Sequence, residues 1–150
     1  MAVRVQLEDF DAGDEISQLR TARKDIGAVV SFVGQVRDMN VGEHVSELTL
    51  EHYPGMTEKA LETIVAQAKS RWDIVDILVI HRIGTLKPLD QIVLVAVSSA
   101  HRGEAFHACE FVMDYLKTEA PFWKKEKLQS GEYRWVEAKD SDDTARERWT

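Results

Sequence analysis

The hydrophobic and polar positions of two long segments follow the period of an α-helix. These segments are 57–72 (TEKALETIVAQAKSRW) and 103–118 (GEAFHACEFVMDYLKT). The apolar stripe consists of Leu61, Ile64, Val65, Ala68 and Trp72 in the first, and of Phe106, Cys109, Val112, Met113 and Leu116 in the second. Each pattern predicts an amphipathic helix with one face in the core, and Pro121 is expected to end the second helix.

Seven shorter segments have the alternating or compact apolar pattern of β-strands. They are 3–7, 27–34, 45–52, 74–84, 91–99, 122–128 and 132–138. A parallel crossover needs about a dozen residues or more, so the short connection 85–90 predicts an antiparallel pair on either side of it. The last two strands flank the turn 129–131 (QSG) and predict a hairpin.

The remaining segments predict smaller elements. Segment 11–22 is expected to form a short helix with Ile16 and Leu19 on its inner face, and 35–44 a polar loop. The C-terminal segment 141–149 predicts another short helix with Ser141 as its N-cap. The sequence has no repeat, low-complexity tract or Pro/Gly/Ser-rich linker, so a single α+β domain over residues 1–150 is expected.

Composition and charge narrow the possible functions of these 150 residues. Lys plus Arg number 19 and Asp plus Glu 26, which gives a net charge of −7 and argues against DNA or RNA as the main partner. A local cationic pocket for a small anion is still compatible with this charge. With one cysteine, Cys109, the chain has no internal disulfide or CxxC pair, and Cys109 is expected to be inert core.

Membrane and metal sites are not predicted. The longest apolar runs, such as IVLVAV, are far shorter than the ~20 residues that span a bilayer, and the first residues lack the apolar run of a signal peptide. A cytoplasmic enzyme or binding protein is therefore expected. His44, His52 and His107 are scattered without metal-ligand spacing, and His81 is expected to end a strand with its hydrogen bonds satisfied.

The stretch 114–127 (DYLKTEAPFWKKEK) concentrates lysines and aromatics at a proline corner of this acidic chain. Lys117 lies at the margin of the helical stripe, and the corner is able to bring Lys124 beside it, with Phe122 and Trp123 excluding water. Neighbouring lysines depress one another's pKa, which suits acid–base or nucleophilic chemistry. The alternative interpretation is a solvated helix end followed by an exposed polar strand.

Two further segments are candidates for anion binding. In SSAHRGE, His101 and Arg102 fall at the start of the second long helix, where free N–H groups and an arginine fork hold phosphate well. Alternatively, Glu104 simply neutralises Arg102 on the surface. In FVGQVRDMN, a strand end delivers Arg37 and Asn40 into a loop, which by itself is a weak signal.

Taken together, several blocks of this sequence resemble the large subunit of molybdopterin synthase. They are FVGQVRDMN, LEHYPGMTEKAL, VIHRIG, SSAHR, MDYLKTEAPFWKKE and YRWVEA, in the same order as in that family. The resemblance implies an α/β-hammerhead-like fold with an additional antiparallel β subdomain. It also implies a sulfurtransferase that converts cyclic pyranopterin monophosphate to molybdopterin in molybdenum cofactor biosynthesis, without a resident cofactor or metal.

The resemblance further implies the partners and the site. Sulfur would arrive as the thiocarboxylate of the C-terminal Gly-Gly of a small ubiquitin-like subunit, and two copies of this chain would form the central dimer of a heterotetramer. Lys117 and Lys124 would be catalytic. The implied substrate-binding residues are Gln35, Val36, Arg37, His101, Arg102, Lys117, Lys124, Lys125 and Glu126.

Individual roles follow from the same resemblance. Arg37, His101 and Arg102 would hold the phosphate and pterin, Lys117 would meet the incoming C-terminus, and Glu126 would orient Lys124. Relatives often have lysine where this chain has Gln35, so a direct charge contact from that position is not expected. The competing hypothesis is a non-catalytic module that binds a phosphorylated small molecule or an acidic peptide tail.

Overall fold

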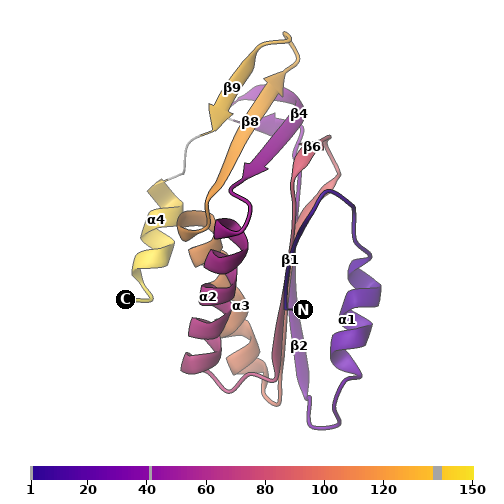
Figure 1. The fold of residues 1–150 in the computed structure, drawn as a ribbon, viewed down its shortest axis with the longest axis vertical. Coiled ribbons are helices and arrows are strands. Elements are labelled where there is room, and N and C mark those ends of the chain that lie inside the picture. The colour runs from indigo at the N-terminus through magenta and orange to yellow at the C-terminus, as the bar shows by residue number, and fades with distance from the viewer. Residues whose placement is uncertain (1, 41, 137–139) are drawn as a thin grey trace.

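Two β-sheets, one above the other in Figure 1, form the frame of the protein. The computed structural model describes residues 2–40, 42–136 and 140–150. The lower sheet has the order β1 (Val3–Gln6), β5 (Asp76–Arg82), β7 (Gln91–Ser99) and β2 (Ala28–Gln35). The upper sheet is built from β3 (Met39–Asn40), β4 (Glu43–His52), β8 (Phe122–Leu128) and β9 (Tyr133–Val136), and β6 (Gly84–Leu86) pairs with β4.

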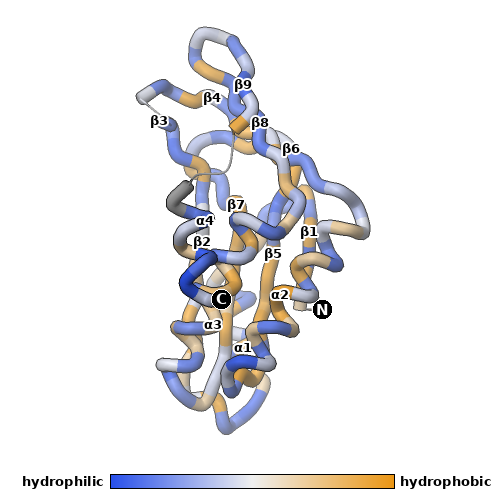
Figure 2. The backbone as a smooth tube through the Cα atoms, turned by 90° about the vertical axis from the view of Figure 1, so that its left-hand side faces the viewer, coloured by the Kyte–Doolittle hydropathy of each residue, from blue (hydrophilic) through white to orange (hydrophobic). Residues whose placement is uncertain are grey.

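Helices cover both faces of the lower sheet (Figure 1). Helices α2 (Met56–Arg71) and α3 (Arg102–Glu119) pack on one face, and α1 (Ala12–Arg20) packs on the other. The central strands β5 and β7 are therefore buried on both faces, and in Figure 2 the β5 strand is hydrophobic along most of its length. The short helix α4 (Asp140–Glu147) lies against α3.

Most of the predicted elements are present. The pair β5–β7 is antiparallel, β8 and β9 form the predicted hairpin, and α3 ends at Glu119 before Pro121. Mixed helices and strands, with a second antiparallel sheet that carries the hairpin, confirm the predicted α+β fold class. On α1, Leu19 is buried and Ile16 packs against the same cluster, as expected.

Three local predictions were wrong. Phe106 is 59% exposed, because the buried stripe of α3 runs through the small residues Ala105 and Ala108, which let the helix approach the sheet closely. The predicted polar loop contains β3, a strand too short to show a period, which pairs with the start of β4. Ser141 lies inside α4, which begins one residue earlier, so it is not the N-cap.

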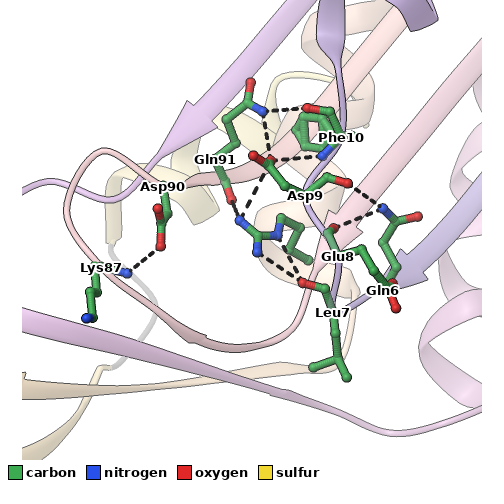
Figure 3. A network of polar contacts seen from close by, with 9 residues as sticks. Gln6, Leu7, Glu8, Asp9, Phe10, Lys87, Asp90 and Gln91 are labelled. Atoms are coloured by element: carbon green, nitrogen blue, oxygen red, sulfur yellow. Dashed lines mark hydrogen bonds and ion pairs between the residues drawn. The ribbon is translucent and has the colours of Figure 1, made fainter.

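A polar network fastens the β1–α1 connection to the ends of β5 and β7 (Figure 3). The Arg82 guanidinium donates from Nε and Nη2 to the Leu7 carbonyl, at 3.2 and 3.0 Å, and from Nη1 to the Gln91 carbonyl at 3.1 Å. Gln91 Nε2 in turn donates to Asp9 Oδ1 at 2.9 Å and to the Phe10 carbonyl at 2.8 Å. These bonds tie the Arg82 side chain, at the end of β5, to the backbone of Leu7 and Gln91.

Candidate functional site

Two adjoining hollows lie where the upper sheet, the end of β2 and the C-terminal end of α3 meet. The smaller has a volume of about 160 Å³ and the larger about 410 Å³. The residues that line both are Gln35, Arg37, Ile92, Lys117 and Lys124. Three cationic side chains, from α3, from β8 and from the connection after β2, therefore share one recess in a chain whose net charge is −7.

The two lysines converge because each sits at a fixed place on its element. Lys117 is an exposed residue of the last turn of α3, next to the buried Leu116. Alternation along β8 directs Phe122, Lys124 and Glu126 to one side of the strand, and each of them lines at least one of the hollows. The predicted convergence of Lys117 and Lys124 is thus present in the structure, while their catalytic role stays a prediction.

Arg37 is held by its neighbour Val36, which is buried and belongs to a small core cluster with Leu48, Leu50 and Leu86. The Val36 N–H donates to the Asp90 carbonyl at 2.9 Å, and the Val36 carbonyl accepts from the Leu89 N–H at 2.9 Å. Val36 also lines the smaller hollow with Gln35. The backbone that carries Arg37 is therefore fixed, although its side chain is exposed.

Two residues of the FWKKEK stretch lie on the opposite side of β8 from the hollows. Trp123 is exposed and pairs across the sheet with Glu51, so it does not shield the lysines as predicted. Lys125 lines neither hollow. Its ammonium lies 5.2 Å from the centre of the Tyr133 ring and 5.5 Å from that of Trp135. The strict alternation of a strand explains both placements, since only every second residue reaches one face. A substrate-binding role for Lys125 stays a prediction.

His101 and Arg102 do not join the recess within one chain. They lie at the start of α3, and 15 helical residues at about 1.5 Å each place Arg102 roughly 22 Å from Lys117. Neither serine caps the helix with its side chain, because His101 is the N-cap and Ser99 Oγ accepts from the His101 N–H at 3.2 Å. Among the described residues, no ion pair joins Arg102 to Glu104.

Glu126 is buried, and its carboxylate is bonded across the upper sheet. Asn40 Nδ2 donates to both carboxylate oxygens, at 3.1 and 3.0 Å, and Arg134 Nε donates to Oε1 at 3.0 Å. These bonds tie β3 and β9 to β8 at the floor of the smaller hollow. Glu126 therefore shapes the recess, whereas the orientation of Lys124 by Glu126 stays a prediction.

His81 is the site residue that the sequence reasoning missed. It is 3% exposed, lines the larger hollow, and stacks on Phe122 with ring centres 3.8 Å apart. Burial above all lowers the pKa of His81 to about 3, and the nearby charges of Lys124, Lys117 and His52 lower it further. The sequence does contain a signal for His81, because it directly follows four apolar residues (ILVIH). Such a position is expected to be buried, and a buried polar side chain is stable only when it has hydrogen-bond partners.

Other candidate chemistry is not supported by geometry. Cys109 is buried, and burial raises the pKa of its thiol to about 11, so it is the inert core residue that was predicted. Within residues 2–40, 42–136 and 140–150 there is no group of three His, Cys, Asp or Glu side chains able to hold a metal ion. Over the same residues, no helix is long and apolar enough to cross a membrane.

The sequence similarity of this chain to known proteins identifies its family. The model of the family described as MoaE protein matches residues 5–119. A molybdopterin synthase catalytic subunit from Ralstonia nicotianae is 65% identical over 147 residues, which cover 98% of this chain and 83% of that protein.

Solved structures agree with the sequence comparison. A molybdopterin biosynthesis MoaE protein from Burkholderia ambifaria superposes with a TM-score of 0.84 at 56% identity, and covers 99% of this chain and 98% of that one. A complex of subunits 1 and 2 of molybdopterin-converting factor from Helicobacter pylori, at 20% identity, shares the fold with a TM-score of 0.73 over 93% of this chain and 92% of that one. This chain therefore belongs to the MoaE protein family, the family of molybdopterin synthase catalytic subunits.

Proposed function

We propose that the recess lined by Arg37, Lys117 and Lys124 is the sulfur-transfer site, where a cyclic pyranopterin monophosphate is converted to molybdopterin. The observation that carries this proposal is the meeting of three cations from separate segments of the chain in one hollow of an acidic protein. The substrate brings a phosphate, and the small ubiquitin-like subunit brings a C-terminal thiocarboxylate. Two anions that must react with each other need such a cationic site to approach closely.

The position of each cation in the recess suggests its role in sulfur transfer. Arg37, on its fixed backbone, offers a planar fork to the phosphate. Lys117, exposed at the end of α3, meets the incoming C-terminus, and the less exposed Lys124 stabilises charge and moves protons. In each of the two transfers, the thiocarboxylate sulfur attacks a substrate carbon that carries oxygen, and the new C–S bond replaces the C–O bond, whose oxygen leaves with a proton from Lys124. Water then hydrolyses the resulting thioester, which leaves sulfur on the product and a carboxylate on the small subunit. The cytoplasm stays the predicted compartment.

A second copy of the chain completes this site in our proposal. Strand β2 is an edge of the lower sheet, and its middle residues Phe32 and Val33 are 41% and 39% exposed. An open apolar edge of this kind favours pairing with another strand. If two β2 strands pair antiparallel about their centres, Ala28 of one copy lies opposite Gln35 of the other. Ala28 pairs with Ser99, just before His101, so the start of α3 in one copy would reach the recess of the other.

The reaction itself is tested by reconstitution. The chain is mixed with a thiocarboxylated small subunit and cyclic pyranopterin monophosphate, and dithiolene product is measured. We expect product only when all three components are present and the small subunit carries its thiocarboxylate. Binding of the phosphorylated substrate without conversion would instead support the rival hypothesis of a non-catalytic binding module.

Mixed dimers test the shared site. Arg102→Ala and Lys117→Ala are each expected to be nearly inactive alone. Co-expressed in equal amounts, they should recover about a quarter of wild-type activity, because half of the dimers are mixed and each mixed dimer has one intact site of two. The control pair Lys117→Ala with Lys124→Ala damages both sites of a mixed dimer and should recover nothing. Equal behaviour of the two pairs would refute a site shared between copies.

A further inference from the structure

His81 is placed to act on the lysines of the recess, although nothing above assigns it a role in sulfur transfer. It lies on β5, near the end of the strand, between Val5 of β1 and Val93 of β7. Its ring lines the larger hollow together with Lys117 and Lys124. An apolar residue would fill this buried space without the cost of burying two polar nitrogens. The hydrogen-bond partners of the two ring nitrogens therefore have to be explained.

The hydrogen bonding of the ring fixes its tautomer. Nδ1 lies 2.8 Å from the Arg82 carbonyl oxygen, which only accepts, so Nδ1 carries the proton and donates it. The backbone at Arg82 pairs with Gln6 of β1, and its side chain is held by the network of Figure 3. Nε2 is therefore left with a lone pair. The ring that carries this lone pair lines the larger hollow.

The plane of the ring is fixed relative to β8. His81 and Phe122 are stacked, with 17° between their planes. Lys124 follows Phe122 by two residues and emerges on the same side of the strand. The stack therefore holds the imidazole on the side of β8 from which Lys124 emerges, and both side chains line the same hollow.

The surroundings keep this imidazole uncharged. The cations that face it are Lys124 from β8, Lys117 from α3 and Arg37 after β2, with His52 at the end of β4 and Arg82 next to it in β5. A second positive charge in this buried place would be strongly unfavourable. His81 is thus a neutral hydrogen-bond acceptor among cations, a group that can hold an ammonium without competing for the substrate's negative charge.

We propose that His81 is a positioning residue of the sulfur-transfer site: its Nε2 accepts a hydrogen bond from the Lys124 ammonium and holds that ammonium toward the reacting anions. The inference rests on the proposed function of the recess. It requires no chemistry of His81 itself, because the ring keeps its proton on Nδ1 throughout.

Two variants separate positioning from packing. His81→Phe keeps the stacked ring but removes the acceptor, and should lower kcat about 10- to 100-fold with KM for the pterin substrate changed less than about 2-fold, since one hydrogen bond to a charged group is lost. His81→Gln returns an acceptor and should recover most of the loss.

Without the acceptor the charged Lys124 ammonium is less stabilised, so the basic limb of the pH–kcat profile should move to lower pH in His81→Phe only. Wild-type kcat and an unmoved basic limb in His81→Phe would overturn the proposal.

A second measurement needs neither substrate nor a stable His81→Phe protein. In the 15N spectrum of histidine-labelled protein, the signals that are absent from His81→Gln belong to His81. We expect a protonated Nδ1 and an unprotonated Nε2, and Lys124→Met should shift the Nε2 resonance. Lys87→Met, at an exposed turn lysine, is the control and should leave it in place. A proton on Nε2, or an Nε2 resonance that Lys124→Met does not move, would refute the proposal even if the recess proves to be the sulfur-transfer site.

Discussion

A Lys117→Ala variant is expected to lose about 10²- to 10⁴-fold in the rate of molybdopterin formation, the range that a positioned acid–base or charge-stabilising group supplies. The side chain is exposed at the last turn of α3, while the neighbouring Leu116 provides the core contact. Removing Lys117 therefore takes away a charge from the recess without opening a cavity. The loss should appear in kcat and not in thermal stability, which is expected to change by no more than about 0.5 kcal/mol.

The matched control for this variant is Lys59→Ala, at an exposed helical lysine of α2. Lys59 lines neither hollow, so this variant should retain full activity with the thiocarboxylated small subunit. Binding of the small subunit, measured by calorimetry, separates the two roles proposed for Lys117, because a pure docking role would weaken binding without a loss of kcat at saturation. Normal turnover by Lys117→Ala would remove this residue from the mechanism.

The second large effect expected is a loss of stability in mild acid that traces to a single histidine. Burial lowers the pKa of His81 to about 3 in the folded protein, whereas a histidine of the unfolded chain has its ordinary pKa of 6.5. Above pH 6.5 the residue is neutral in both states and has no effect on the pH dependence. Between pH 6.5 and 3 only the unfolded chain takes up the proton, so stability falls as pH falls, by about 1.4 kcal/mol per pH unit.

His81→Phe provides the comparison that isolates this residue, because phenylalanine does not titrate. Urea unfolding at pH 7, 5 and 4 gives the difference in unfolding free energy between the two proteins. Between pH 7 and pH 4 that difference should change by about 3 kcal/mol in favour of the variant. Parallel pH profiles for the two proteins would show that His81 takes up its proton at the same pH in the folded and the unfolded chain, and would contradict an imidazole that burial keeps neutral in mild acid.

Periodicity predicted the elements well where one face of a segment is simply apolar. The long helices, the antiparallel β5–β7 pair and the β8–β9 hairpin follow from the local pattern along each segment. It failed at Phe106, where bulk was mistaken for burial and two alanines make the actual contact with the sheet. Lys125 was included through the family resemblance, which does not say toward which side of a strand a side chain points, and the structure places it on the opposite side of β8 from the hollows.

The sequence by itself determined the two amphipathic helices, the α+β class, the family and the candidates Arg37, Lys117 and Lys124, because these depend on local spacing and on short blocks of residues. Only the tertiary structure decided which candidates meet. It brought Lys117 and Lys124 into one recess with Arg37, placed His101 and Arg102 at the far end of α3, and added His81 from the centre of the sheet. The physical reason is that a helix or a strand fixes only the direction in which each of its side chains points. The packing of the elements against one another decides which of those side chains come close in space.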